Sequence, residues 1–178
     1  MLFRVIIFCL VFFGSFKSYA DTTTLRMANW LPPTHPWVLN IMIPWIEKVK
    51  VVTKGRITIE ILKAPLGPPP AHFDFAVNGI VDITYGVHNY TAGRFPTTRL
   101  AELPFLSNSS EILSVAWQRI YERELLKLNE HKGTHLLGVF THGPGQLWFN
   151  KKYNSLKSIQ GLKVRIGGGI AQSSAKAL

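Results

Sequence analysis

The sequence predicts an α/β fold with a largely parallel sheet, because segments with strand and helix periodicity alternate along the chain. A first strand is expected from Thr24 to Asn29, ending where Pro32 and Pro33 prevent further ladder pairing. Apolar residues at helical spacing predict a helix from Pro36 to Lys54, and residues 56–62 alternate strictly between apolar and polar, as in a half-buried strand. Ligands of such folds bind beyond the carboxyl ends of the strands.

The next segments continue the alternation. A short helix is expected from Ala71 to Asn78, closed by Gly79 in the left-handed conformation, and a strand from Ile80 to Tyr85 follows. The loops after the predicted strands contain the candidate binding residues Trp30, His88, Asn89 and Tyr90. Two interpretations stay open for each of them: a place in a ligand pocket, or core packing for the ring of Trp30 and a loop without function for the others.

The second half of the chain is expected to begin with a long helix from Asn108 to about Asn129. Asn108 would cap it, with Glu111 as the reciprocal partner of a capping box. Further strands are predicted over three segments, and a helical pattern begins at Ile170 after three glycines. The three strand segments are residues 134–141, 146–150 and 161–166.

The first twenty residues have the pattern of a secretory signal peptide. Arg4 precedes an apolar run from Val5 to Phe13, and Ser18-Tyr19-Ala20 is a small-x-small cleavage pattern. The run is shorter than the roughly 20 residues that span a bilayer, although an uncleaved anchor is the alternative. We therefore expect residues 1–20 to be a signal peptide and the mature chain to be periplasmic. It would begin near Asp21 and contain no cysteine, so we expect neither disulfides nor thiolate metal sites.

The charge is strongly basic. The net charge of the whole chain is +10, and without Arg4 and Lys17 the 20 basic residues become 18 against 10 acidic ones, near +8. The basic residues are scattered and are not interleaved with aromatic residues, so we expect no nucleic-acid partner. A positive field that attracts small anions is the remaining interpretation.

No arrangement of residues predicts a metal, a cofactor or catalysis. His131 and His135 have the spacing of a helical metal pair, but Gly133 lies between them and no acidic pair is near in sequence. A Gly-x-Ser-x-Gly nucleophile elbow is absent. The glycines at 167–169 are followed by neither a further glycine at Gln172 nor the Lys-Ser/Thr pair of a phosphate loop. We expect no enzymatic activity.

Arg165 is the residue with the clearest chemical potential. It stands in an alternation of Leu162, Val164 and Ile166, which predicts a half-buried strand. One interpretation is a strand charge in solvent, paired with a nearby carboxylate. The other is a fork of donors for a ligand carboxylate, a geometry that arginine matches bidentately and lysine does not.

Four segments together resemble the DctP-type solute receptors of TRAP transporters, which deliver organic acids to a membrane carrier. They are LRMANWLPPTHP (25–36), GIVDITYG (79–86), Gly93–Phe95 with Glu102–Phe105, and SIQGLKVR (158–165). The resemblance implies a type II periplasmic-binding-protein-like fold of two lobes and places the arginine that receives the ligand carboxylate at Arg165. It also implies a small carboxylate ligand, the membrane subunits of a TRAP transporter as partner, and a monomer if the chain is complete.

Two departures from the family pattern affect this expectation. Many relatives bring a second arginine where this chain has residues 142–146, so Gln146 or His142 is expected to donate instead. Relatives also continue well beyond the position of Leu178, so we expect a C-terminally truncated receptor. Its first lobe would be residues 21–141, lacking the returning strands, and residues 142–178 would begin the second lobe. The alternatives are a non-functional remnant of such a receptor and an exported α/β enzyme.

Overall fold

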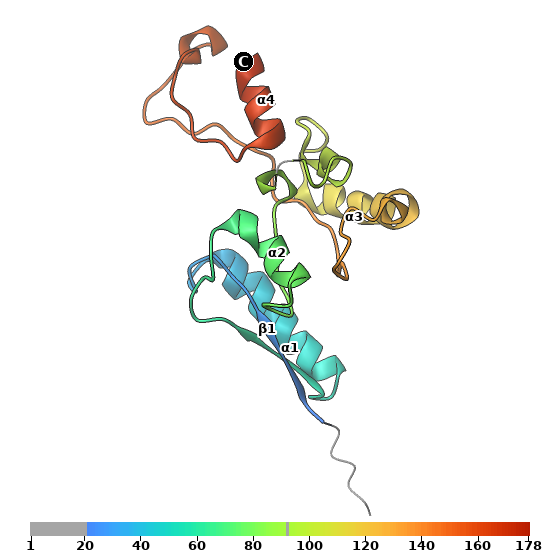
Figure 1. The fold of residues 1–178 in the computed structure, drawn as a ribbon. Coiled ribbons are helices and arrows are strands. Elements are labelled where there is room, and N and C mark those ends of the chain that lie inside the picture. Colours follow the sequence, from blue (N-terminus) through green and yellow to red (C-terminus); the bar gives the residue numbers. More distant parts are fainter. Residues whose placement is uncertain (1–20, 92) are drawn as a thin grey trace, which may run out of the picture.

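The computed structural model describes residues 21–91 and 93–178, so the expected signal peptide lies outside the described residues. The strands β1 (Thr23–Met27) and β2 (Ile57–Ile61) pair in parallel, and Thr23 lies opposite Ile57 at the start of the register. The helix α1 (Ile43–Val52) connects the two strands and packs beside them, as Figure 1 shows. The predicted strand, helix and strand at the start of the chain are therefore confirmed.

The helix before β2 contains one irregular turn. A π-helical turn, η1 (Val38–Met42), leads directly into α1, and the Ile43 amide donates to the Val38 carbonyl. Pro44 has no amide hydrogen and cannot continue the regular ladder, so a wider turn at this point accommodates it. The structure thus places a π turn directly before Pro44.

One apolar cluster holds this unit together. Met27 of β1 and Val38 and Met42 of η1 are each at most 5% exposed. The partly buried residues packed on them come from all surrounding elements: Leu31, Trp37, Ile46, Ile59, Ile61, Ile83 and Tyr85. Burial of apolar side chains contributes about 1.5–3 kcal/mol each, so this cluster is the main support of the sheet.

The strand predicted from Ile80 to Tyr85 is wrong in extent. A single parallel bridge joins Ile83 to Met27, and the amide of Ala28 donates to the Ile83 carbonyl at 2.9 Å. The side chain of Asp82 interrupts the ladder, because its Oδ2 accepts the Arg26 amide at 2.7 Å. The preceding turn η2 (Pro69–Ala71) and helix α2 (His72–Val77) agree with the predicted short helix, and Gly79 has a φ of +65° as its cap requires.

The long helix begins one residue later than predicted. In α3 (Ser110–Ile120) the cap is Ser109, whose Oγ accepts the Ile112 amide at 3.3 Å, and not Asn108. Ser109 has an extended backbone, which brings its hydroxyl over the first turn, and the capping box with Glu111 is lost with the shift. The helix continues as a π turn, η5 (Tyr121–Leu125), and a 3₁₀ turn, η6 (Leu126–Leu128).

The three strands predicted after residue 130 are not present among the described residues. Two amides of residues 134–141 donate to side chains of α3: Val139 to Gln118 Oε1 at 2.7 Å and Thr141 to Ser114 Oγ at 2.9 Å. A strand needs a neighbouring backbone, and here helix side chains satisfy the amides instead. Val139 joins a second apolar cluster with Ala101, Trp117 and Tyr121. Segments 146–150 and 161–166 have no regular structure.

Short helical elements complete the chain. The 3₁₀ turns are η3 (His88–Tyr90), η4 (Thr98–Glu102) and η7 (Leu156–Ile159), and α4 (Gly169–Ala177) confirms the helical pattern expected after the three glycines. The C-terminal helix lies at the opposite end of the molecule from the start of β1 (Figure 1). Within the described ranges, no helix combines the length and apolar character needed to cross a membrane.

Glu130 follows the long helix and joins it to η4 through hydrogen bonds. A substitution at Glu130 therefore tests how much this contact stabilises the part of the protein that contains the second apolar cluster. Its carboxylate accepts the amides of Thr97 and Thr98 at 2.8 Å and the Thr98 hydroxyl at 2.6 Å. Replacing Glu130 with alanine leaves these donors unpaired, and Thr98 is only 1% exposed. We expect the free energy of unfolding to fall by about 2–3 kcal/mol, measured by urea denaturation.

Glu124→Ala is the matched control. Its exposed carboxylate pairs with Arg123 and Lys127 on the surface of the helix, and such pairs contribute little. Equal stability of the two variants would contradict a structural role for Glu130.

Candidate functional site

The loop at His88–Tyr90 is built around Asn89, which is 8% exposed. Its backbone amide donates to Glu102 Oε1 at 3.2 Å, and its side-chain Nδ2 donates to Glu102 Oε2. Its remaining polar atom, Oδ1, accepts the backbone amide of Ile170 at 3.3 Å. Asn89 therefore joins η4 on one side to the first turn of α4 on the other.

The three glycines after the Arg165 segment pack directly on this loop. A Cβ at Gly167 would lie 3.5 Å from the ring of Tyr90, and one at Gly168 would lie 3.6 Å from the Asn89 carbonyl. A Cβ at Gly169 would overlap the side-chain oxygen of Asn89. The structure thus brings the end of the predicted arginine strand against the predicted loop of His88, Asn89 and Tyr90.

Arg165 is exposed, and its segment has no regular structure. Within residues 21–91 and 93–178 its guanidinium makes no hydrogen bond or ion pair. The interpretation as a strand charge paired with a nearby carboxylate therefore has no support among the described residues. The guanidinium is accessible to a ligand from solvent.

Trp30 belongs to a group of aromatic rings at the carboxyl end of β1. Its ring stacks on Tyr85 with centroids 3.9 Å apart and meets the edge of His72 at 4.6 Å. Tyr85 donates from its hydroxyl to Asn29 Oδ1 at 2.7 Å, and burial raises the pKa of Tyr85. The ring of Trp30 remains partly exposed. No hydrogen bond or cation–π contact among the described residues joins Trp30 to Arg165.

His88 is held by a second histidine. Its Nε2 lies 3.0 Å from His131 Nε2, and His131 Nδ1 lies 3.0 Å from the hydroxyl of Tyr121. Burial, reinforced by the charge that His131 can carry, lowers the pKa of His88 to about 4, and Glu130 acts in the opposite direction. Burial also lowers the pKa of His131. The lowered pKa values favour neutral rings at pH 7, and in that form one Nε2 can donate a hydrogen bond to the other.

The remaining predicted donors are not assembled into a site. Gln146 is exposed and makes no hydrogen bond to another described residue. His142 Nδ1 contacts the carbonyl of the adjacent Gly143 at 2.6 Å. His135 is exposed while His131 is buried, and the described residues contain no group of three potential metal ligands.

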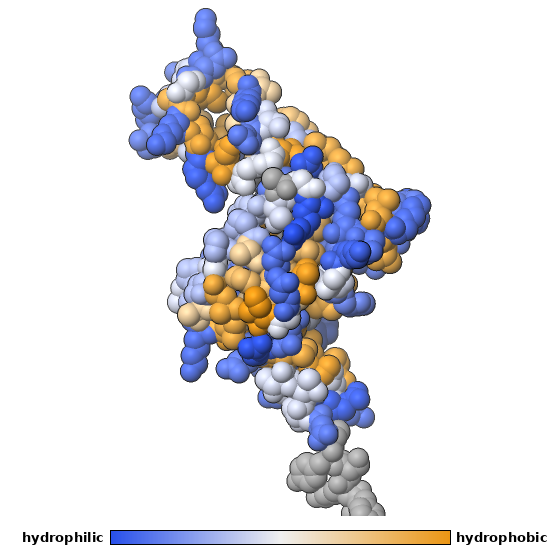
Figure 2. All heavy atoms as spheres, in the orientation of Figure 1, coloured by the Kyte–Doolittle hydropathy of each residue, from blue (hydrophilic) through white to orange (hydrophobic). Residues whose placement is uncertain are grey.

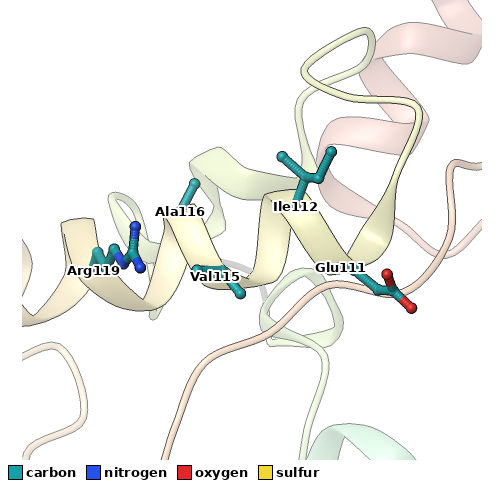
Figure 3. A pocket seen from close by; sticks show the side chains of 5 residues that line it. All are labelled: Glu111, Ile112, Val115, Ala116 and Arg119. Carbon is teal, nitrogen blue, oxygen red and sulfur yellow. The ribbon is translucent and has the colours of Figure 1, made fainter.

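A surface hollow of about 410 Å³ lies elsewhere, on one face of α3. Figure 3 shows that all its lining side chains come from this helix, with Ile112 and Ala116 on the same side. The hollow contains none of the predicted site residues, and its charged groups are Glu111 and Arg119 near its ends. Figure 2 shows several apolar areas, in orange, on the face of the molecule in view.

Several residues of the site were not predicted from the sequence. Glu102 and His131 hold the loop of Asn89 and His88, and Tyr85 supports the ring of Trp30. Tyr85 ends a predicted strand and carries an aromatic ring, which is a usable signal for a residue beside a ligand pocket. Nothing in the local sequence indicates the partners of His131.

The parallel strand-helix-strand unit has polar and aromatic side chains beyond its strand ends, which is where ligands bind in α/β folds. Comparison with known proteins identifies the family. The chain belongs to the bacterial extracellular solute-binding protein family 7, the DctP family, whose model matches residues 27–178.

Solved structures agree with this assignment. The chain is 42% identical to a TRAP periplasmic solute-binding protein from Bordetella bronchiseptica, solved with (R)- and (S)-mandelate, with a TM-score of 0.82 over 87% of this chain and 50% of that one. It is 35% identical to a TRAP solute-binding protein from Rhodoferax ferrireducens with copurified benzoate, with a TM-score of 0.62 over 69% and 38%.

A curated relative carries a transporter name. The chain is 29% identical over 148 residues to the outer membrane transporter protein TsaT of Comamonas testosteroni. The aligned part covers 83% of this chain and 44% of that protein. The chain therefore spans about half the length of the relatives it matches. The resemblance to DctP-type receptors and the type II periplasmic-binding-protein-like fold class are confirmed, and the family and its solved neighbours are solute-binding proteins.

Proposed function

We propose that the protein carrying this chain is a periplasmic solute receptor that captures a small organic acid for a TRAP-type transporter. Arg165 receives the ligand carboxylate through a bidentate, charge-assisted pair. The observation that carries the proposal is the family match together with an arginine, at the position that the family motif assigns to the carboxylate, whose guanidinium is exposed and unpaired among the described residues.

The ligand is an aromatic monocarboxylate. Relatives from two bacteria were solved with mandelate and with benzoate, and a marine metagenome relative, 33% identical, was solved with 3-hydroxybenzoate. The partly exposed ring of Trp30, supported by Tyr85, offers a flat apolar surface at the carboxyl end of β1. Aromatic rings pack favourably on such surfaces, which supports the same ligand class.

The other predicted residues have distinct parts in this proposal. Trp30 and Tyr90 line the wall of the first lobe, and Gln146 donates to the ligand from the second. His88 and Asn89 hold the wall in place, since the Nε2 atom of His88 lies against His131 and the side chain of Asn89 is engaged by Glu102 and Ile170.

Residues 21–141 form the first lobe and residues 142–178 the start of the second, with the hinge near Thr141–Pro144. The bonds of Thr141 to Ser114 support this division, because they hold the chain on α3 up to that point. Closure of the lobes on the ligand would present the receptor to the membrane subunits of the transporter. The receptor acts as a monomer, uses no cofactor or metal, and catalyses no reaction.

The experiment is a calorimetric titration of the purified full-length protein with benzoate, mandelate and 3-hydroxybenzoate. Benzamide and mandelamide are matched control ligands, because they keep the ring and lose the charge. A charge-assisted hydrogen bond contributes about 1.5–3 kcal/mol, so we expect the acids to bind about 10- to 100-fold more tightly than the amides. Binding of amides and acids with equal affinity would refute a carboxylate receptor. A chain that neither melts cooperatively nor binds any acid would favour the non-functional remnant.

A further inference from the structure

We infer that Asn89 is a positioning residue that ties the Arg165 segment to the rest of the protein through the first turn of α4. Its role does not require contact with the ligand. The inference rests on the proposed function only where it assigns the carboxylate to Arg165. The tie itself is a property of the fold and can be measured without a ligand.

The Ile170–Asn89 bond has no substitute among the described residues. Of all hydrogen bonds within 21–91 and 93–178, it alone joins residues 142–178 to the preceding part of the chain. Arg165 lies shortly before this anchor, on a segment without regular structure. Loss of the bond would leave the guanidinium on a segment attached only through its covalent connection at Thr141 and through packing.

Asparagine is the side chain that fits this place. The position needs a donor toward Glu102 and an acceptor toward the Ile170 amide, and the carboxamide supplies one on each side. Burial raises the pKa of Glu102, and the hydrogen bonds from Asn89 act against that shift. An aspartate at position 89 would keep the acceptor but would place a second carboxylate against Glu102.

Gly169 is the matching requirement on the other side of the contact. Its φ of +51° lies in the left-handed region, and a Cβ would overlap Asn89 Oδ1 and lie 3.1 Å from Asn89 Cβ. Because a Cβ there would displace Asn89 or the helix, glycine permits the approach of α4. The three glycines after Arg165 therefore act as a close-packing surface for Asn89 and Tyr90, consistent with the absence of a phosphate-loop motif.

The test combines a distance with an affinity. Spin labels on Lys48→Cys in α1 and Lys176→Cys in α4 report how the Arg165 segment sits relative to the sheet. Residues 21–178 contain no native cysteine, and any cysteine elsewhere in the protein is replaced by serine. We expect Asn89→Ala and Asn89→Asp to broaden the distance distribution in the ligand-free full-length protein and to weaken benzoate binding about tenfold. The double variant Asn89→Asp/Glu102→Gln restores a donor opposite the acceptor, so both measurements should return toward the parent values.

Gly169→Ala should broaden the distances in the same way, whereas Gly55→Ala is its control. Gly55 has a φ of +77°, and no atom lies within 4 Å of a Cβ built there. Gly55→Ala therefore introduces the same kind of backbone strain without a clash against Asn89. Equal broadening in Gly55→Ala and Gly169→Ala would overturn the steric part of the inference.

The remaining outcomes are distinct. If Asn89→Ala weakens binding while the distances stay unchanged, Asn89 contacts the ligand and the positioning role is wrong. If neither measurement changes, or if the double variant fails to rescue Asn89→Asp, the tie is also refuted. If Arg165→Ala binds benzoate normally, the assignment of the carboxylate to Arg165 fails. The spin-label distances still decide whether Asn89 holds the segment in place through Ile170.

Discussion

Arg165→Ala is expected to weaken binding of the aromatic acid at least 100-fold in Kd and to leave the melting temperature unchanged. The guanidinium is exposed and pairs with no other described residue, so its removal leaves no buried partner without a charge. A bidentate charge-assisted pair contributes about 3 kcal/mol, which corresponds to this loss. Calorimetric titration of benzoate and thermal denaturation of the same samples measure the two quantities.

Arg165→Lys separates charge from geometry in the same experiment. Lysine keeps the positive charge but lacks the planar fork, so we expect an affinity between those of the parent and the alanine variant. Lys163→Ala is the control, because it removes another exposed positive charge from the same segment. Loss of affinity in Lys163→Ala equal to that in Arg165→Ala would indicate a general field effect, and unchanged affinity in Arg165→Ala would refute the anchor.

The second large effect is a loss of stability in acid caused by His88. Its pKa is about 4 in the folded protein and near 6.5 when unfolded, so between these values the unfolded state binds the extra proton. The stabilisation is therefore fully present above pH 6.5 and is lost as the pH falls toward 4. The full difference is about 3 kcal/mol, since one pKa unit corresponds to 1.36 kcal/mol.

We expect the melting temperature to fall between pH 7 and pH 5 and the fall to be smaller in His88→Gln. The comparison with the variant is needed because His131, Glu102 and Glu130 also titrate near this loop. Burial lowers the pKa of His131, so its protonation destabilises the fold in the same direction as that of His88. The pKa of Glu102 is raised by burial, so that group becomes more favourable to folding as the pH falls and partly masks the effect of His88. His135→Gln is the control, since His135 is exposed. An identical pH profile in His88→Gln and the parent would contradict the prediction.

The candidate site was predictable from the sequence in its residue types and only partly in its assembly. The position of Arg165 follows from a local alternation and from its motif, and Trp30 follows from its place after a strand. The structural roles of Asn89 and His88 could not be predicted from the sequence. Their hydrogen-bond partners, Ile170 and His131, are 81 and 43 residues away in the chain. Local patterns carry no information on such pairings.

The same distinction explains the errors in the fold. The predicted capping box failed by one residue because Ser109 competes with Asn108 for the first turn, and both residue types are good caps. The strands predicted at 134–141, 146–150 and 161–166 have the right alternation, but a ladder forms only where a second backbone lies alongside. Residues 134–141 find Gln118 and Ser114 of α3 instead.

The sequence by itself determined the α/β alternation at the start of the chain, the family and the presence of an arginine suited to a carboxylate. These depend on residue type and short-range spacing, which periodicity and backbone chemistry control directly. Only the tertiary structure decided that Asn89 is already engaged, that His88 lies within hydrogen-bonding distance of His131, and that Gly169 packs against Asn89. Each of these depends on which distant atoms come within hydrogen-bonding or van der Waals distance, and that is settled by the packing of the whole chain.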